Sequence, residues 1–240
     1  MWSICKKETG QFFSSLTGYL AIILFLLING IFLFVLKDSN IFDFGYASLD
    51  GFFDLAPWVL LFLIPAITMR SFSDEFKSGT FEILRTKPLT AGQIVYGKYL
   101  SVLLIILFSL LPTILYVFTI QSLSTTGHID TGGIAGSFCG LFLLASVFAA
   151  ISICAGSFTS NAIVSFLISA TACLLLYFGF TAISSIPVFA GNMDYYIEMC
   201  GIDFHYRSIS RGVIDSRDVV YFISMIFLFL TITKNRVGRI

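Results

Sequence analysis

Six apolar runs, separated by short polar stretches, constrain this chain more than any other feature of its sequence. A helix rises 1.5 Å per residue, so about 20 apolar residues cross a bilayer core and about 17 to 25 are tolerated. Five runs meet this length, and the sixth, with 14 residues, reaches it only if Tyr221 and a snorkelling Arg217 mark its outer edge. The runs predict an all-α membrane protein with six transmembrane helices in one domain over residues 1–240. The predicted spans are Leu16–Leu36, Phe52–Met69, Tyr99–Ile120, Gly136–Gly156, Ala162–Ile186 and Val219–Ile232.

Charged residues are scarce, and their absence from the spans excludes several functions. They make up 12% of the chain, against about 25% in soluble domains. Apart from Asp54, near the start of the second span, the six runs contain no Asp, Glu, Lys, Arg or His. Ion-coupled transporters, proton channels and intramembrane proteases need such groups inside the membrane. We expect His128 and His205, both in loops, to be solvated or interfacial.

The five cysteines and the net charge indicate no further chemistry. The cysteines are scattered without a CxxC pair, so we expect neither a metal site nor a disulfide. Lys plus Arg equals Asp plus Glu, at 14 each, and nothing favours nucleic-acid binding. No small-residue cleavage site follows the first apolar run, so we expect no cleavable signal peptide.

The distribution of positive charge predicts the orientation. Ten Lys and Arg residues lie on the side of the amino terminus and four on the other side. Because positive residues stay on the cytoplasmic side, both termini and the loop after the second span are expected in the cytoplasm of a bacterial cell, with the spans in its inner membrane. Residues 1–17, with Trp2, Phe12 and Phe13 near one helical face, predict a helix lying in the membrane interface and touching lipid.

The polar stretch Arg70–Leu89 lies between the second and third spans and has internal order. Its first half has helical spacing, with Phe72 and Phe76 one turn apart on one face. Asp74 and Glu75 are expected to point away from that face. Twenty residues are more than a simple connection needs, so the stretch favours a docking element over a tether.

Two helix breaks divide the second half of this stretch. Gly79 is expected to end the first helix, because glycine costs about 1 kcal/mol in a helix interior relative to alanine. Thr80 is expected to cap a second, short helix with Glu82 in its first turn, where the helix dipole favours an anion. Pro88 ends that helix, and Thr90–Gln93 has the spacing of a capping box that starts the third span.

A set of spaced residues runs through this stretch and into the next span: Glu75, Gly79-Thr80, Glu82, Leu84, Pro88-Leu89 and Gly97-Lys98. The set resembles the coupling-helix motif of ABC type-2 permeases, in which this segment rests in a groove of a separate ATPase subunit. The resemblance implies that the ATPase-coupling residues are Arg70, Phe72, Glu75, Phe76, Gly79, Thr80, Glu82, Leu84 and Pro88.

Two longer segments, Ala56–Phe76 and Arg207–Ser224, resemble permease subunits of the GldF type in gliding-motility machinery. This resemblance covers nearly the whole chain. It implies two partners, a cytoplasmic ATPase of the GldA type and a second membrane subunit of the GldG type.

An apparent phosphate-binding motif at Gly92–Lys98 is set aside. The spacing fits a P-loop, but Tyr99 stands where Ser or Thr must bind magnesium, and no strand precedes it. We therefore expect no enzymatic site and no cofactor on this chain, with ATP and magnesium on the partner ATPase.

The outer loop 187–218 is long and rich in aromatic residues, among them Phe189, Tyr195, Tyr196 and Phe204. A loop of this size is expected to fold into one or two short amphipathic helices over the mouth of the bundle. The family resemblance implies that these helices dip into the membrane and help to close an outer gate. A lid that only packs and anchors the last two helices fits the sequence equally well.

Several residues within the spans have two interpretations. Pro57, Pro65 and Pro112 remove backbone hydrogen bonds and either bend their helices or simply pack. Small residues four apart, at Gly136–Gly140 and Ala145–Ala149, favour close helix contact. The hydroxyl residues either line a pathway or bond to their own backbones: Ser109, Thr113, Thr119, Ser152, Ser165, Ser169 and Thr171.

Three functions stay open from the sequence. The first is the permease half of an ATP-driven transporter, which couples hydrolysis on another subunit to transport. The second is a mechanical transducer that uses the same fold and moves no solute. The third is a membrane enzyme or scaffold without an ATPase.

Overall fold

A computed structural model describes the chain except residues 37–47, 87, 124–129, 187–190 and 240. The described part is all-helical, as predicted, and has no strand. Its elements are α1 (Trp2–Ser14), α2 (Leu16–Phe34), α3 (Asp50–Thr68), α4 (Arg70–Lys77), α5 (Thr80–Arg85), α6 (Ala91–Leu110), the 3₁₀ turn η1 (Leu111–Thr113), α7 (Ile114–Leu123), α8 (Thr131–Gly156), α9 (Ala162–Ser184), α10 (Asn192–Glu198), α11 (Ile202–Ile209) and α12 (Ser216–Arg239).

Five helices in the described part are long and apolar enough to cross a membrane. They are Asp50–Lys77, Ala91–Leu123, Thr131–Gly156, Ala162–Ser184 and Ser216–Arg239. A sixth is reached if α1 and α2, which bend by 71° at their junction, count as one span. Length and composition therefore confirm a membrane protein with five to six spans.

Two helices extend well beyond the apolar runs that predicted them. The run Val219–Ile232 has 14 residues, and the helix that contains it, α12, has 24 because it continues into polar residues at both ends. The third helix begins at Ala91, before the apolar run that starts at Tyr99. At this end the Thr90 hydroxyl oxygen accepts a hydrogen bond from the Gln93 amide N–H at 3.3 Å. The side-chain carbonyl oxygen of Gln93 in turn accepts one from the Thr90 amide N–H at 3.1 Å. This confirms the predicted capping box.

The centre of the fold is α8, which packs against α3, α4, α6, α9, α11 and α12. Small residues permit this, as predicted: a Cβ on Gly136 would lie 2.7 Å from the carbonyl oxygen of Gly212, and one on Gly140 would lie 2.5 Å from Ile209. Ala145 and Ala149 are fully buried. The apolar core therefore surrounds the middle of α8.

The three prolines have different effects. Helix α3 continues through Pro57 and Pro65, both of which are buried in its packed face. Pro112 lies in η1, where the α-helical pattern changes to a tighter 3₁₀ turn between α6 and α7. Only the last therefore interrupts its helix.

Most of the hydroxyl residues bond to their own helix. The side chains of Ser109, Thr113, Thr119, Ser169 and Thr171 donate to carbonyls three or four residues earlier. Ser152 lies 3.9 Å from the Cys173 sulfur, and the buried Ser165 hydroxyl has no partner. The five that donate within their own helices need no pathway to explain them, because each hydroxyl already has an acceptor.

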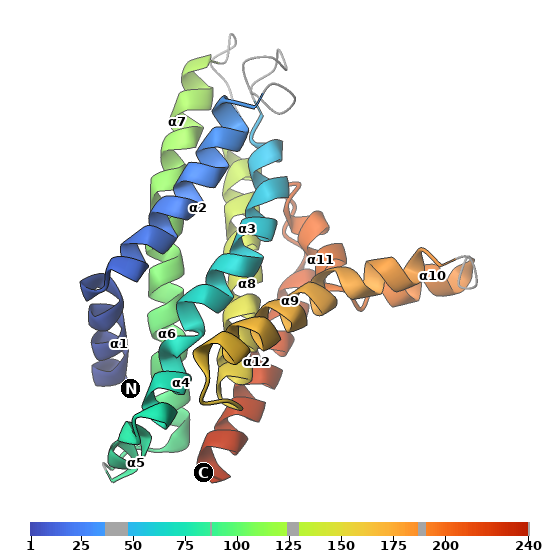
Figure 1. Ribbon diagram of the computed structural model, residues 1–240. Helices are drawn as coiled ribbons and strands as arrows, with labels where there is room; N and C mark the ends of the chain where they lie inside the picture. Colours follow the sequence, from blue (N-terminus) through green and yellow to red (C-terminus); the bar gives the residue numbers. More distant parts are fainter. Residues whose placement is uncertain (37–47, 87, 124–129, 187–190, 240) are drawn as a thin grey trace.

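Both termini and the α4–α5 segment lie at one end of the molecule (Figure 1). The end of α7 lies at the opposite end, and α9 runs sideways from the bundle with α10 at its far end. The chain thus places the predicted coupling segment on the same side as its two ends.

Candidate functional site: a coupling segment on a buried ion cluster

The predicted coupling segment, Arg70–Leu89, contains α4 and α5, which are joined by a turn at Gly79. The helix α4 ends where the amide of Ser78 donates to the carbonyl of Asp74, and Gly79 follows with φ of +69°. An L side chain rarely adopts this left-handed conformation, so glycine is required there. The prediction that Thr80 caps the second helix is wrong: Gly79 occupies the cap, and the Thr80 hydroxyl lies 2.9 Å from that of Ser78.

Aromatic side chains hold the two helices together. The rings of Phe76 and Phe81 meet edge to face at 4.9 Å, and those of Phe72 and Phe76 stack at 5.8 Å. Phe72 is fully buried and Phe81 nearly so. This small core fixes the angle between α4 and α5, because aromatic pairs prefer such geometries.

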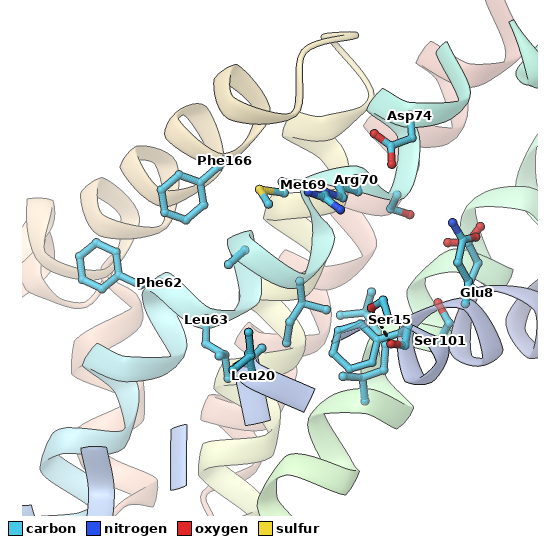
Figure 2. A pocket seen from close by; sticks show the side chains of 18 of the residues that line it. Glu8, Ser15, Leu20, Phe62, Leu63, Met69, Arg70, Asp74, Ser101 and Phe166 are labelled. Carbon is cyan, nitrogen blue, oxygen red and sulfur yellow. Dashed lines mark hydrogen bonds between the residues drawn. The ribbon is translucent and has the colours of Figure 1, made fainter. Parts of the chain in front are cut away.

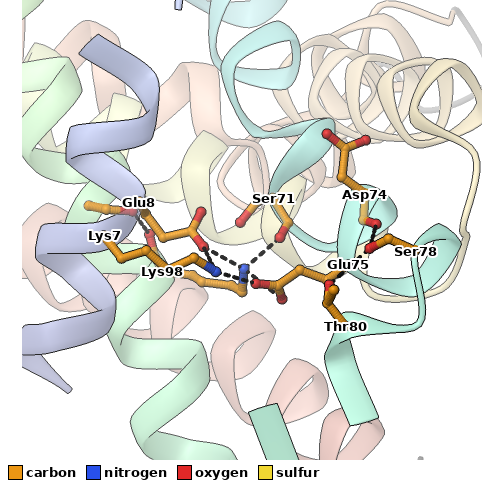
Figure 3. Close-up of polar contacts among 9 residues, drawn as sticks. Lys7, Glu8, Ser71, Asp74, Glu75, Ser78, Thr80 and Lys98 are labelled. Atoms are coloured by element: carbon orange, nitrogen blue, oxygen red, sulfur yellow. Dashed lines mark hydrogen bonds and ion pairs between the residues drawn. The ribbon is translucent and has the colours of Figure 1, made fainter. Parts of the chain in front are cut away.

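Four charged side chains form an ion cluster between α1, α4 and α6: Lys7, Glu8, Glu75 and Lys98. The Lys98 ammonium, which is completely buried, lies 2.9 Å from a carboxylate oxygen of Glu8 and 3.0 Å from one of Glu75. It also donates to the carbonyl of Ser71 and lies 4.9 Å from the Phe72 ring centre. Figure 3 shows the ammonium between these groups, which together replace its hydration shell.

The sequence predicted that Asp74 and Glu75 both point away from the Phe72–Phe76 face, but the structure turns Glu75 inward to Lys98. Its carboxylate is buried and also accepts from the exposed Lys7 ammonium at 3.1 Å. Asp74, its neighbour in sequence, is exposed and follows the prediction. The helix rotates Glu75 inward because the buried Lys98 requires an anion on that face.

The helix α1 is anchored to α6 beside this cluster. Gly97 makes the contact possible, since a Cβ there would lie 3.0 Å from both Ile4 and the Met1 carbonyl. Ile4 and Cys5 are buried against α6, whereas Trp2 is 69% exposed. The Gly97-Lys98 pair thus has a local role: glycine admits α1, and lysine binds its Glu8.

The remaining predicted coupling residues form the outer face of the segment. Arg70, Gly79, Thr80, Glu82 and Pro88 are exposed, and Phe76 and Leu84 are half-buried. Ile83, which the sequence analysis did not single out, is 62% exposed on α5. Hence the site has two layers, a buried one with Phe72 and Glu75 and an exposed one on α5.

Three of the predicted lid residues, Tyr195, Tyr196 and Phe204, lie in the described part, and their rings contact one another around Tyr195. Two short helices, α10 and α11, confirm the expected secondary structure of the loop. Tyr195 and Tyr196 are exposed on α10, and Phe204 is half-buried on α11 with its ring 5.8 Å from that of Tyr195. Phe189 and His128 lie outside the described residues.

His205 was expected to be solvated or interfacial; the structure buries it, so the solvated alternative is wrong. Its Nδ1 lies 2.7 Å from a carboxylate oxygen of Asp218, and its Nε2 lies 2.9 Å from the carbonyl oxygen of Met199. The ring stacks on Tyr221 at 3.9 Å, and the Tyr221 hydroxyl donates to the carbonyl of Cys200. These contacts tie α11 to the start of α12.

Asp203, on the same helix, faces α9. Its carboxylate is 2% exposed, pairs with the exposed Arg207 at 2.7 Å and lies 3.5 Å from the Thr181 hydroxyl. The Tyr206 hydroxyl donates to the carbonyl of Phe53 on α3 at 2.7 Å. Burial, with nearby Asp54 and Asp203, raises the pKa of that hydroxyl well above its ordinary value, so it stays a donor. We call Asp203, His205, Arg207 and Asp218 the α11 cluster.

In the described part, metal-ligating side chains do not cluster, and the cysteines form no disulfide. No three His, Cys, Asp or Glu residues there converge in a way that would hold a metal ion. Cys5, Cys154 and Cys173 are buried, Cys139 and Cys200 are exposed, and all five are free.

Comparison with known proteins gives one finding that covers most of the chain. The model of a family described as "ABC-2 family transporter protein" matches residues 2–199. No curated protein matches the sequence.

Proposed function

Since this chain belongs to the ABC-2 family of transporter proteins, we propose that it is a permease subunit driven by ATP hydrolysis on a separate ABC ATPase. The family implies such a partner, because its domains are membrane subunits without the nucleotide-binding domain. ATP and magnesium would then bind the partner alone.

The observation that carries the proposal is the two-layered coupling segment. Its exposed layer offers Ile83 and Glu82 on a short helix, and its buried layer connects that helix to three others through Lys98. A docking element must combine an accessible apolar contact with a rigid support. The segment has both.

The same contacts give a route for movement. A push on α5 passes to α4 through the Phe72, Phe76 and Phe81 rings, and α4 follows α3 directly at Met69. The ion pair between Glu75 and Lys98 would carry this displacement from α4 to α6. The ion pair between Lys98 and Glu8 would carry it on to α1 and the bend before α2. ATP-driven closure of two ATPase domains would therefore displace several spans together.

The membrane, the orientation and the individual partners are proposed from the sequence. We propose that the chain acts in the inner membrane with both termini cytoplasmic, which the charge distribution supports. Its resemblance to GldF supports a role in gliding motility, with a GldA-like ATPase and a GldG-like second membrane subunit. The α11 helix, packed between α8, α9 and α12, would serve as the outer gate.

A second candidate is a mechanical transducer that uses the same coupling without moving a solute. Its supporting observation is that most of the hydroxyl groups in the spans bond to their own helices rather than to a channel. ATP-dependent uptake by vesicles that hold the complete complex would identify a transporter. Unchanged ATP turnover with no solute movement would identify the transducer.

The coupling proposal is tested by charge placed on the exposed layer. We expect Ile83→Lys or Glu82→Lys to reduce the co-purified ATPase at least about tenfold, because either change disrupts the centre of a small interface. The matched control is Val213→Lys, which puts the same charge on a residue 66% exposed in the turn after α11. ATPase is quantified by mass spectrometry after pull-down from native membranes.

Membrane insertion and thermal unfolding should be unchanged in all three variants. Full retention of the ATPase by the α5 variants would refute the coupling role. Recovery of a complex that contains no nucleotide-hydrolysing subunit would instead favour the scaffold.

A further inference from the structure

A cavity of about 1000 Å³ lies beside the ion cluster, between α1, α2, α3, α4 and α6. Its wall is apolar over most of its depth, with Leu20 and Leu24 from α2 and Phe62 and Leu63 from α3. Its rim is charged and is formed by α1 and α4, with Glu8 on one side and Arg70 and Asp74 on the other (Figure 2). A site of this size accommodates a substantial organic ligand, and its polarity changes along one direction.

Two of the charged rim residues are available to a ligand. Lys7, Glu8 and Glu75 are engaged in the ion cluster. Arg70 and Asp74 line the cavity, are exposed, and form no ion pair with any residue that the structure describes. They are four residues apart on α4, so a cation and an anion lie side by side on one helix face.

We propose that this cavity binds one phospholipid whose head group carries a phosphate and a primary ammonium, as in phosphatidylethanolamine. The Arg70 guanidinium binds the phosphate in a two-pronged hydrogen-bonded arrangement, and the Asp74 carboxylate accepts from the ammonium. One acyl chain lies between α2 and α3. This inference does not depend on the proposed coupling to an ATPase.

The head group, rather than the acyl chain, must give the selectivity. An acyl chain gains little by leaving a bilayer for an apolar groove, because both surroundings are equally apolar. Arg70 and Asp74 are therefore what distinguishes a bound lipid from the bulk lipid. An apolar helix of a second membrane subunit would fill the wall but leave both charges without a partner, so the observations favour a lipid.

The full-length protein is tested by native mass spectrometry from micelles with phosphatidylethanolamine, phosphatidylcholine or phosphatidylglycerol. We expect one phosphatidylethanolamine per chain to be retained, and Arg70→Gln to weaken its binding about tenfold. Asp74→Asn should remove the preference over phosphatidylcholine, whose quaternary ammonium has no proton to donate. Lys77→Gln is the matched control, since Lys77 is an exposed cation on α4 outside the cavity.

Two further measurements address the acyl chain. Ala66→Phe, which places a ring in the cavity, should displace the lipid while leaving Arg70 and Asp74 in place. Glycerophosphoethanolamine, the head group without acyl chains, should compete only at a far higher concentration, because the acyl chains hold the lipid in the micelle beside its site.

Equal retention of all three lipids or an unchanged affinity in Arg70→Gln would overturn the proposal. So would loss of the lipid on complex assembly together with crosslinks from Phe62→Cys to a second membrane subunit. The ATPase pull-down on Asp74→Asn and Ala66→Phe, at two residues outside the predicted coupling set, reports separately on coupling, so failure of one proposal is distinguishable from failure of the other.

Discussion

The ion cluster around Lys98 and the α11 cluster around His205 both bury charge, but they join different kinds of neighbours. Lys98 binds Glu8, 90 residues away, and Lys7 binds Glu75, 68 residues away. In the α11 cluster the separations are 13 residues for His205 and Asp218 and four for Asp203 and Arg207. The first cluster fixes how three distant helices meet, whereas the second orients one short helix against the next.

The charges are also balanced differently. The ion cluster has two cations and two anions, and its central ammonium is shared by two carboxylates. The α11 cluster uses single pairs, each supported by a further hydrogen bond to a carbonyl or a hydroxyl. Loss of Lys98 should therefore be more damaging than loss of one member of the α11 cluster, because two carboxylates lose their buried counter-charge at once and keep only the exposed Lys7.

The largest effect is expected for Lys98→Met. This change leaves the carboxylates of Glu8 and Glu75 partly buried without their shared cation, and should destabilise the protein by about 3–5 kcal/mol. Unfolding by denaturant in mixed micelles measures the loss. Lys77→Met, which removes an exposed cation of α4, should change the stability by no more than about 0.5 kcal/mol.

The triple variant Lys98→Met, Glu8→Gln, Glu75→Gln tests the cause of that loss. If uncompensated charge is responsible, the triple variant should recover most of the stability, because no buried carboxylate remains. A triple variant as unstable as the single one would instead assign the effect to packing of the lysine stem.

A smaller effect is expected for Asp218→Ala. It leaves the buried His205 ring with one nitrogen unsatisfied and should cost about 2 kcal/mol. Arg217→Ala is the control, because it removes the adjacent, exposed charge of α12. If Asp218→Ala costs as much as Lys98→Met, the contrast between the two clusters does not hold.

The smallest effect is expected for Tyr206→Phe, which removes one neutral hydrogen bond between α11 and α3. The expected cost is about 1 kcal/mol. Tyr196→Phe, at an exposed hydroxyl on α10, should have no measurable effect. Thermal unfolding of both variants compares them, and equal midpoints would show that the Tyr206 contact contributes nothing.

The sequence predicted those features that depend on residues close together in the chain. The capping box at Thr90 needs only a partner three residues on, and the break at Gly79 follows from the freedom of glycine. The small residues of α8 share one helix face, so close packing was also predictable. In each case the local pattern is the physical cause.

Features that depend on distant partners were not predictable. Periodicity placed Asp74 and Glu75 together on the polar face, but Lys98 brings one of them inside. His205 looked like a loop residue because its burial requires Asp218 and Tyr221, which lie on another helix. Charge alone does not reveal which member of a polar run finds a buried counter-charge.

The 3₁₀ turn at Pro112 divides a 33-residue span into two pieces that contact different helices. The first piece holds Gly97 and Lys98 and so shares every displacement of α1 and α4. The second is held instead through Tyr116, whose hydroxyl donates to the carbonyl of Leu26 on α2 and whose ring meets that of Phe52 on α3. Because the α-helical pattern tightens to a 3₁₀ turn between the two pieces, one continuous span answers to two different sets of neighbours, α1 and α4 before the turn and α2 and α3 after it.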